Sequence, residues 1–231
     1  MLAAMVLGVV AGAEAFEPSV FGGAEFDNHG QGFAFLGGDV AQKIHPNFSL
    51  AGRLMPNFLT YKFRSEGDEV TATSPGLYAL LGVKGRWGQT SAGLLAGGEV
   101  RDTELDPDVR SAEVRGTTAA PLVQVEFDTW LPSRTNFNYF GSFTGTDSFI
   151  YQKGGVKQQL TNLDYAGPNT VNGGVEVVWG SNPDFEMYQL GLVVEMFSIP
   201  HTLSLQARGG YKHDTTFGNG FYGGLTFFKG F

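Results

Sequence analysis

The chain has 231 residues, a formal net charge of −8, 42% hydrophobic residues and only 16% charged residues. It contains no cysteine, which excludes a disulfide framework, a thiolate nucleophile and a cysteine-ligated metal. The acidic balance also argues against nucleic acid as a partner, because a nucleic-acid surface needs basic residues to neutralise phosphates.

Residues 1–15 carry features of a secretory signal peptide. An apolar run from Leu2 to Val10 leads to Ala13-Glu14-Ala15, which is an A-x-A cleavage pattern. The run is too short for a transmembrane helix, which needs about 20 apolar residues. The basic residues that usually precede such a run are missing, and a buried hydrophobic arm is the alternative. We expect a mature domain over residues 16–231 that works outside the cytoplasm.

From residue 16 onward, apolar and polar residues alternate with a period of two between turn residues. One run, for example, places Leu190 and Leu192 on one face and Gln189 and Glu195 on the other. In chain order the pattern predicts twelve strands, over residues 17–27, 31–41, 47–64, 69–85, 89–101, 112–130, 135–146, 148–161, 169–180, 184–197, 201–213 and 217–229.

The face opposite the apolar one carries Gly, Gln, Ser and Asn with few charges, whereas a soluble sandwich carries a charged exterior there. Aromatic residues near the expected strand ends are typical of the interfacial girdles of outer-membrane barrels; they are Phe33, Phe48, Trp87, Trp130, Phe137, Tyr151, Trp179, Phe197, Tyr211 and Phe227. We therefore predict an all-β fold, a single transmembrane antiparallel up-and-down β-barrel of about 12 strands. An even number of strands places both termini on one side, which we expect to be the periplasm.

The chain ends on FYGGLTFFKGF, in which small and aromatic residues alternate. We expect this segment to be the closing strand, with Phe221 and Leu225 towards lipid and Tyr222 turned inward. Pairing with residues near 20–26 leaves no open edge. The terminal Phe231 resembles the C-terminal signal that such barrels present to their insertion machinery, so we expect that machinery and outer-membrane lipid to be partners.

Five blocks, in order, resemble the BcsS family of cellulose biosynthesis proteins. They are FGGAEFDNHGQGFAFLGGDVA, LAGGEVRDTELDPDVRSAEVRG, VEFDTWLP, NGGVEVVWGSNPDFEMYQLGLVVE and ARGGYKHDTTFGNGFYGGLTF. A longer segment over residues 160–172 departs from the family pattern. The resemblance implies a small barrel in a Gram-negative outer membrane, connected with cellulose export or assembly, with cellulose secretion components or glucan as partners.

Eleven polar residues fall on the inward face by alternation. They are Glu25, Arg53, Glu99, Arg101, Gln124, Glu126, Glu176, Gln189, Glu195, Gln206 and Arg208. Charges inside a barrel must pair or meet water, because an unpaired buried charge is costly. The set is consistent with a polar pore or carbohydrate-contacting lumen, or with an interior filled by Arg–Glu pairs. A barrel of 12 strands lies between packed 8-stranded barrels and open 16-stranded ones.

Two loop features have a functional and a simpler interpretation. Carboxylates in DTELDPD (Asp102, Glu104, Asp106 and Asp108) suit Ca²⁺, but the glycine and final glutamate of an EF-hand loop are missing, so a solvated loop is preferred. Aromatic rings near one mouth (Phe149, Tyr151, Tyr165 and Trp179) suit stacking on sugar, but also an interfacial girdle, which we prefer.

The sequence offers little for catalysis. A lipid-modifying enzyme needs a Ser–His pair oriented by a third group, and His213 has no serine in its segment. His213 and Asp214 are adjacent on a strand and therefore face opposite ways. We predict no cofactor, no metal and no enzymatic activity. The expected function is a non-catalytic barrel acting as channel, docking or scaffold component, with a plugged interaction barrel or a general porin as alternatives.

Overall fold

The computed structural model describes residues 16–65, 67–109, 115–161 and 169–231, so the predicted signal peptide lies outside the described residues. The described part forms twelve strands: β1 (Glu17–Asp27), β2 (Gly32–His45), β3 (Phe48–Ser65), β4 (Asp68–Trp87), β5 (Thr90–Asp106), β6 (Gly116–Trp130), β7 (Thr135–Thr144), β8 (Phe149–Gln159), β9 (Asn169–Asn182), β10 (Phe185–Ser198), β11 (Leu203–Asp214) and β12 (Gly218–Gly230). A 3₁₀ turn, η1 (Thr146–Ser148), precedes β8. No helix in these ranges is long and apolar enough to cross a membrane.

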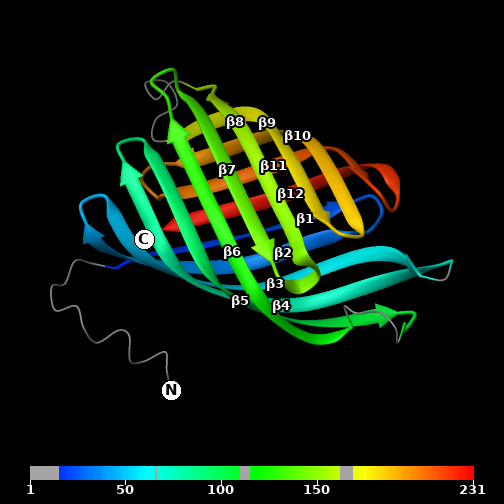
Figure 1. The fold of residues 1–231 in the computed structure, drawn as a ribbon. Coiled ribbons are helices and arrows are strands. Elements are labelled where there is room, and N and C mark those ends of the chain that lie inside the picture. Colours follow the sequence, from blue (N-terminus) through cyan, green and yellow to red (C-terminus); the bar gives the residue numbers. More distant parts are fainter. Residues whose placement is uncertain (1–15, 66, 110–114, 162–168) are drawn as a thin grey trace.

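The strands close into one antiparallel barrel in which each strand pairs with its neighbours in the chain (Figure 1). β1 and β12 complete the circle in a continuous register from Ser19↔Gly230 to Asp27↔Tyr222. The backbone N–H of Phe231 donates to the Pro18 carbonyl at 3.1 Å, so hydrogen bonding extends to the last residue. Closure pairs the first strand with the last, which is what a lipid environment requires. The predicted all-β barrel of about 12 strands and its closing strand are confirmed.

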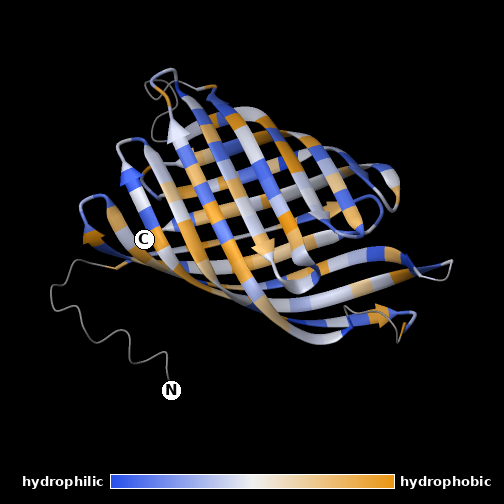
Figure 2. Ribbon diagram, in the orientation of Figure 1, coloured by the Kyte–Doolittle hydropathy of each residue, from blue (hydrophilic) through white to orange (hydrophobic). Residues whose placement is uncertain are grey.

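The two faces of the wall follow the predicted alternation. Leu81 and Leu192 point outward and are about 70% exposed (71% and 69%), whereas inward Leu95 and Leu122 are buried. Figure 2 shows hydrophobic and hydrophilic residues alternating along the strands. An apolar exterior over a mixed interior is the pattern of a transmembrane barrel. Four girdle assignments are wrong because they fall on inward-facing positions. Phe33 packs on the interior apolar cluster, and Tyr151 lies on the inner face against Phe140. Trp130 and Phe197 share the inward parity of β6 and β10.

Four strands extend beyond the apolar belt at the end opposite the termini, which we call the distal end. β3 has 18 residues and β4 has 20, whereas about 9–11 suffice to cross a membrane. The β3–β4 hairpin projects beyond the neighbouring strands in Figure 1. The outer face of this overhang is charged, with Lys62 on β3 paired to Glu69 on β4 at 2.7 Å. This part of the wall therefore suits water rather than lipid.

The interior has two unlike halves. On the side of β1–β6, apolar side chains form a cluster of Ala51, Met55, Tyr78, Leu80, Leu95 and Leu122, with Phe21, Phe33, Phe35 and Ala41 packed against it. On the other side, the inner face of β11 carries polar side chains along its length, namely Ser204, Gln206, Arg208, Lys212 and Asp214. The candidate site residues divide between these halves.

Candidate functional site

All eleven sequence-predicted polar residues lie on the inner face of the barrel. The structure brings them together in four groups rather than in one site. Arg53, Gln124 and Glu126 form the first group, Glu99 and Arg101 the second, and Glu25, Glu176, Gln189 and Arg208 the third. Glu195 belongs to a fourth group, and Gln206 accepts a hydrogen bond from Thr226 at 3.1 Å.

The Arg53 cluster connects β2, β3, β4 and β6 near the terminal end. Arg53 forms a bidentate ion pair with Asp39 on β2, with Nε and Nη2 at 2.7 and 2.8 Å from its two oxygens. Its Nη1 lies 2.6 Å from Glu126 and 2.7 Å from the Gln124 amide oxygen, both on β6. Lys84 approaches Asp39 at 2.6 Å. Planar guanidinium geometry suits such multiple carboxylate contacts, and the cluster extends over the inner face of the wall from β2 to β6.

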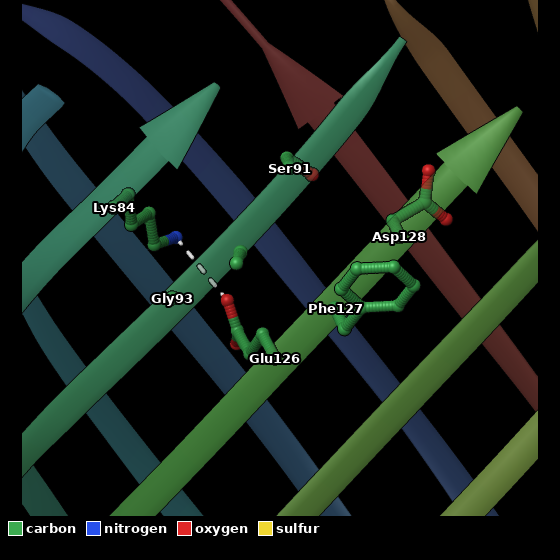
Figure 3. A pocket seen from close by; sticks show the side chains of 7 residues that line it. Lys84, Ser91, Gly93, Glu126, Phe127 and Asp128 are labelled. Atoms are coloured by element: carbon green, nitrogen blue, oxygen red, sulfur yellow. Dashed lines mark ion pairs between the residues drawn. The ribbon is translucent and has the colours of Figure 1, made fainter. Parts of the chain in front are cut away.

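A small hollow of about 180 Å³ opens beside this cluster (Figure 3). Lys84 and Glu126 face each other across it at 3.6 Å, and Gly93 lies on the strand between them. A Cβ at Gly93 would lie 3.4 Å from both side chains, so the glycine keeps this space open. Asp128 at its edge accepts a hydrogen bond from Asn136 at 2.9 Å. Charged side chains and the Phe127 ring both line the hollow, which has room for a few water molecules.

The Glu99 cluster lies further towards the distal end. Arg101 is 3.4 Å from Glu99 on the same strand and donates to the Tyr78 hydroxyl at 3.0 Å. The Thr144 hydroxyl of β7 donates to Glu99. Glu99 is 1% exposed, so this carboxylate is stabilised by its neighbours rather than by bulk water.

The Arg208 cluster occupies the polar half. Arg208 on β11 lies 3.5 Å from Glu25 on β1 and 3.7 Å from Glu176 on β9. The Gln189 amide donates to Glu25 at 2.9 Å, and the Tyr222 hydroxyl donates to Glu176 at 3.2 Å. These contacts connect strands two or three positions apart, so the side chains extend across the inner surface of the wall.

Two further ion pairs lie on either side of the Arg208 cluster. Towards the terminal end, Lys157 contacts Glu195 at 2.7 Å. At the distal mouth, Lys212 pairs with Asp27 and is 3.5 Å from Asp214. Each group mixes cations and anions, so the interior neutralises its own charge locally.

The sequence-based selection missed several partners that complete these groups. They are Asp27, Asp39, Lys84, Lys157, Lys212 and Asp214. Strict alternation along β1, β2, β4, β8 and β11 places each of them on the inner face, so the order of residues along each strand already indicated it. What parity does not reveal is which residue on a distant strand each one meets.

The remaining sequence-predicted features lie outside the network of inward-facing polar residues. β5 continues to Asp106, so Asp102 and Glu104 are strand residues on the outer face, and the expected loop is wrong there. The described ranges contain no group of three or more His, Asp or Glu side chains arranged to hold a metal.

Trp179 donates to Glu186 at 3.0 Å, whereas Tyr165 lies outside the described residues. His213 contacts the Asn219 side chain at 2.8 Å, and the inward Lys212 and Asp214 on either side contact each other.

The family model described as "Cellulose biosynthesis protein BcsS" matches residues 15–231, nearly the whole chain. The chain belongs to the BcsS family. The resemblance drawn from the sequence blocks is thereby confirmed. We find no match to this BcsS-family chain among curated protein sequences.

Solved structures similar to this BcsS-family protein are outer-membrane barrels. The β domain of the Bordetella autotransporter BrkA shares 11% identity with a TM-score of 0.50, covering 94% of this chain and 98% of that one. The transport unit of the autotransporter AIDA-I from Escherichia coli shares 10% identity with a TM-score of 0.50, covering 99% and 94%. At this identity the likeness shows the fold alone.

Proposed function

We propose that this protein is a non-catalytic accessory of cellulose biosynthesis or secretion that acts as a closed docking barrel in the outer membrane. The family supplies the connection with cellulose. The single observation that carries the closed barrel is the contact between Arg53 on β3 and Glu126 on β6, at 2.6 Å over the inner face of β4 and β5.

Burial of the lumen side chains supports the same conclusion. Inward residues of an open, water-filled porin are hydrated. Here inward Gln124 is 2% exposed and inward Asn136 is not exposed. The apolar cluster on β2–β6 fills the same half of the lumen, where water would otherwise pass. A plugged interior leaves the mouths and the overhang as the surfaces through which such a barrel acts.

The orientation follows from the lengths of the strands. Outer-membrane barrels have short periplasmic turns and longer extracellular extensions. β3 and β4, of 18 and 20 residues, carry the charged overhang at the distal end. We propose that the termini are periplasmic and that the overhang is extracellular. The overhang then stands where exported material emerges, and the terminal mouth faces periplasmic machinery.

The role is proposed to be non-catalytic because the reactive side chains lie apart. His213 lies on the opposite face of β11 from Lys212 and Asp214, which leaves it outside the lumen network. Within the described ranges, its side-chain hydrogen bond is to an asparagine rather than to a serine. A lipid-modifying reaction needs a nucleophile and a base in contact.

Planar-bilayer conductance tests the closed barrel directly. We expect the purified, folded protein to give no stable channels, whereas a porin of known conductance inserted under the same conditions gives them. Steady wild-type conductance would contradict the closed barrel and favour a general porin.

Deletion of the gene should lower cellulose output. The wild-type gene, or a chromosomal copy carrying the exposed substitution Lys43→Met, should restore that output. Unchanged output after deletion would contradict the connection with cellulose.

A further inference from the structure

β3 lies at one side of the overhang, which β3 to β6 form, and its outermost residues have a strand on one side only. β2 begins at Gly32, which pairs with Thr60, so residues 61–65 of β3 continue past the end of β2. On their other side these residues pair with β4 without a break, as far as Ser65↔Asp68. Within the described ranges, no backbone hydrogen bond joins residues 61–65 to any element except β4.

The backbone groups of Lys62 and Arg64 point towards this unpaired side. In an antiparallel pair, successive residues direct their N–H and C=O groups alternately to one neighbour and to the other. The Arg86 N–H donates to the Asn47 carbonyl at 2.9 Å, and the β3–β4 register is unbroken from Phe48 onwards, so odd-numbered residues of β3 bond to β4. The N–H and C=O groups of Lys62 and Arg64 therefore face away from β4. We call these four groups the free edge of β3.

The opposite side of the overhang is blocked at Pro121. β6 also runs past the end of its neighbour, since its last pair with β7 is Leu122↔Thr144. There, however, the Gly145 N–H donates to the Pro121 carbonyl at 2.8 Å, and a Cβ at Gly145 would lie 2.6 Å from the Pro121 ring. Prolines and covering segments are common means of blocking a strand edge. The free edge of β3 has neither within the described ranges, so a partner strand can reach it.

The side chains beside the free edge specify the chemistry of that partner. On the outer face, Lys62 is paired with Glu69, whereas the exposed Arg64 forms no ion pair within the described ranges. On the inner face, the rings of Tyr61 and Phe63 have centroids 6.2 Å apart. Opposite charges and aromatic–β-branched pairs stabilise neighbouring strands, and like charges destabilise them. A partner strand therefore needs acidic side chains on one face and apolar ones on the other.

A second copy of this chain does not meet that requirement. Antiparallel pairing of two such edges would place Lys62 and Arg64 of one copy against the same cations of the other. Addition of a strand to a sheet edge is an established mode of peptide binding, in which backbone hydrogen bonds give affinity and alternate side chains give specificity. We infer that the free edge of β3 binds an extended peptide segment in which acidic residues alternate with apolar ones. The free edge is then the docking surface of the overhang, a role that rests on the proposed function.

Fluorescence polarisation with labelled peptides tests the inference on the folded full-length barrel in detergent. We expect a heptapeptide that alternates Glu and Val to bind. The corresponding Lys–Val peptide should bind about tenfold more weakly, because its charges oppose Lys62 and Arg64. Arg64→Glu should reverse this preference. The matched control is Arg86→Glu, the same charge reversal at an exposed arginine near the terminal end of β4, which should leave the preference unchanged.

N-methylation of the peptide separates strand pairing from attraction between charges. One peptide is methylated on the amides of its glutamates and another on the amides of its valines, so each loses the N–H donors of one edge only. Strand pairing requires one of them to bind like the parent peptide and the other to bind about tenfold more weakly.

Equal binding by the two methylated peptides, or no binding of the parent peptide, would overturn the inference. An unchanged preference in Arg64→Glu would overturn the assignment to β3. A barrel that does not bind the peptide but whose deletion still lowers cellulose would remove only this inference, whereas a conducting barrel would remove only the closed-barrel proposal.

Discussion

Arg53 and Glu126 meet at 2.6 Å although β4 and β5 separate their strands in the wall. The Arg53 side chain is 7% exposed, and its guanidinium also stacks over the Phe21 ring at 4.9 Å. One side chain thus joins the polar and apolar parts of the lumen. Its removal affects both the packing and the charge balance.

Arg53→Met should lower the free energy of unfolding by about 3–5 kcal/mol, because it leaves the buried Asp39 and the half-buried Glu126 with fewer partners. Urea unfolding in lipid vesicles, followed by heat-modifiable gel migration, measures the change. Lys62→Met, which breaks the exposed Lys62–Glu69 pair, should lower the free energy of unfolding by about 1 kcal/mol or less. Equal effects at the two positions would contradict a special role for the Arg53 cluster.

Gly191→Ala should displace Tyr222, because the added Cβ would lie 2.0 Å from the tyrosine hydroxyl. The Tyr222–Glu176 hydrogen bond is then lost, and overpacking costs about 1–3 kcal/mol. Near-ultraviolet circular dichroism and urea unfolding report the two effects. Gly154→Ala is the control, since its Cβ would meet only Val177 at an ordinary 3.9 Å. A Gly191→Ala protein indistinguishable from this control would show that Tyr222 does not need the space.

Phe231→Ala should reduce the amount of folded barrel in the outer membrane of living cells and leave refolding into detergent unchanged. The Phe231 ring is 75% exposed, and its backbone bond to Pro18 survives the substitution. A role in recognition by insertion machinery therefore predicts a defect in cells alone. Phe221→Ala, which removes an equally exposed ring, is the control. Slow refolding of Phe231→Ala in detergent would indicate a structural role instead.

Glu186 lies at the distal end of β10, where hydrogen bonds from the Tyr188 hydroxyl and then the Trp179 indole hold its pKa below the usual carboxyl range. A lowered folded-state pKa adds stability that is present above the unfolded-state pKa and is lost as the pH falls through the folded-state pKa. In a variant with Trp87→Phe and Trp130→Phe, we expect Trp179 fluorescence to change below the ordinary range of carboxyl titration. Glu186→Gln should abolish that change, and persistence of the transition would assign it to another group.

Much of the wall could be predicted from the sequence because strand periodicity is local. Alternation around Leu190 and Leu192 located β10 within one residue at each end, and the small–aromatic alternation before Phe231 identified the closing strand. The errors arose where an aromatic or acidic residue was assigned from its chemical type rather than from its position along the strand, which sets the face on which it lies. Tyr151 and Phe33 are inward although aromatic, and Asp102 lies on a strand although acidic.

The sequence by itself determined which side chains face lipid and which face the lumen, because a side chain's direction depends only on its position along its own strand. It did not determine how the inward groups combine. Arg53 meets Glu126, and Arg208 meets Glu25, only because the curved wall brings side chains from non-adjacent strands together. Pairing across a lumen depends on the tilt, register and curvature of the whole barrel. The tertiary structure alone therefore decided which inward charges meet, such as Arg53 with Glu126 and Lys157 with Glu195.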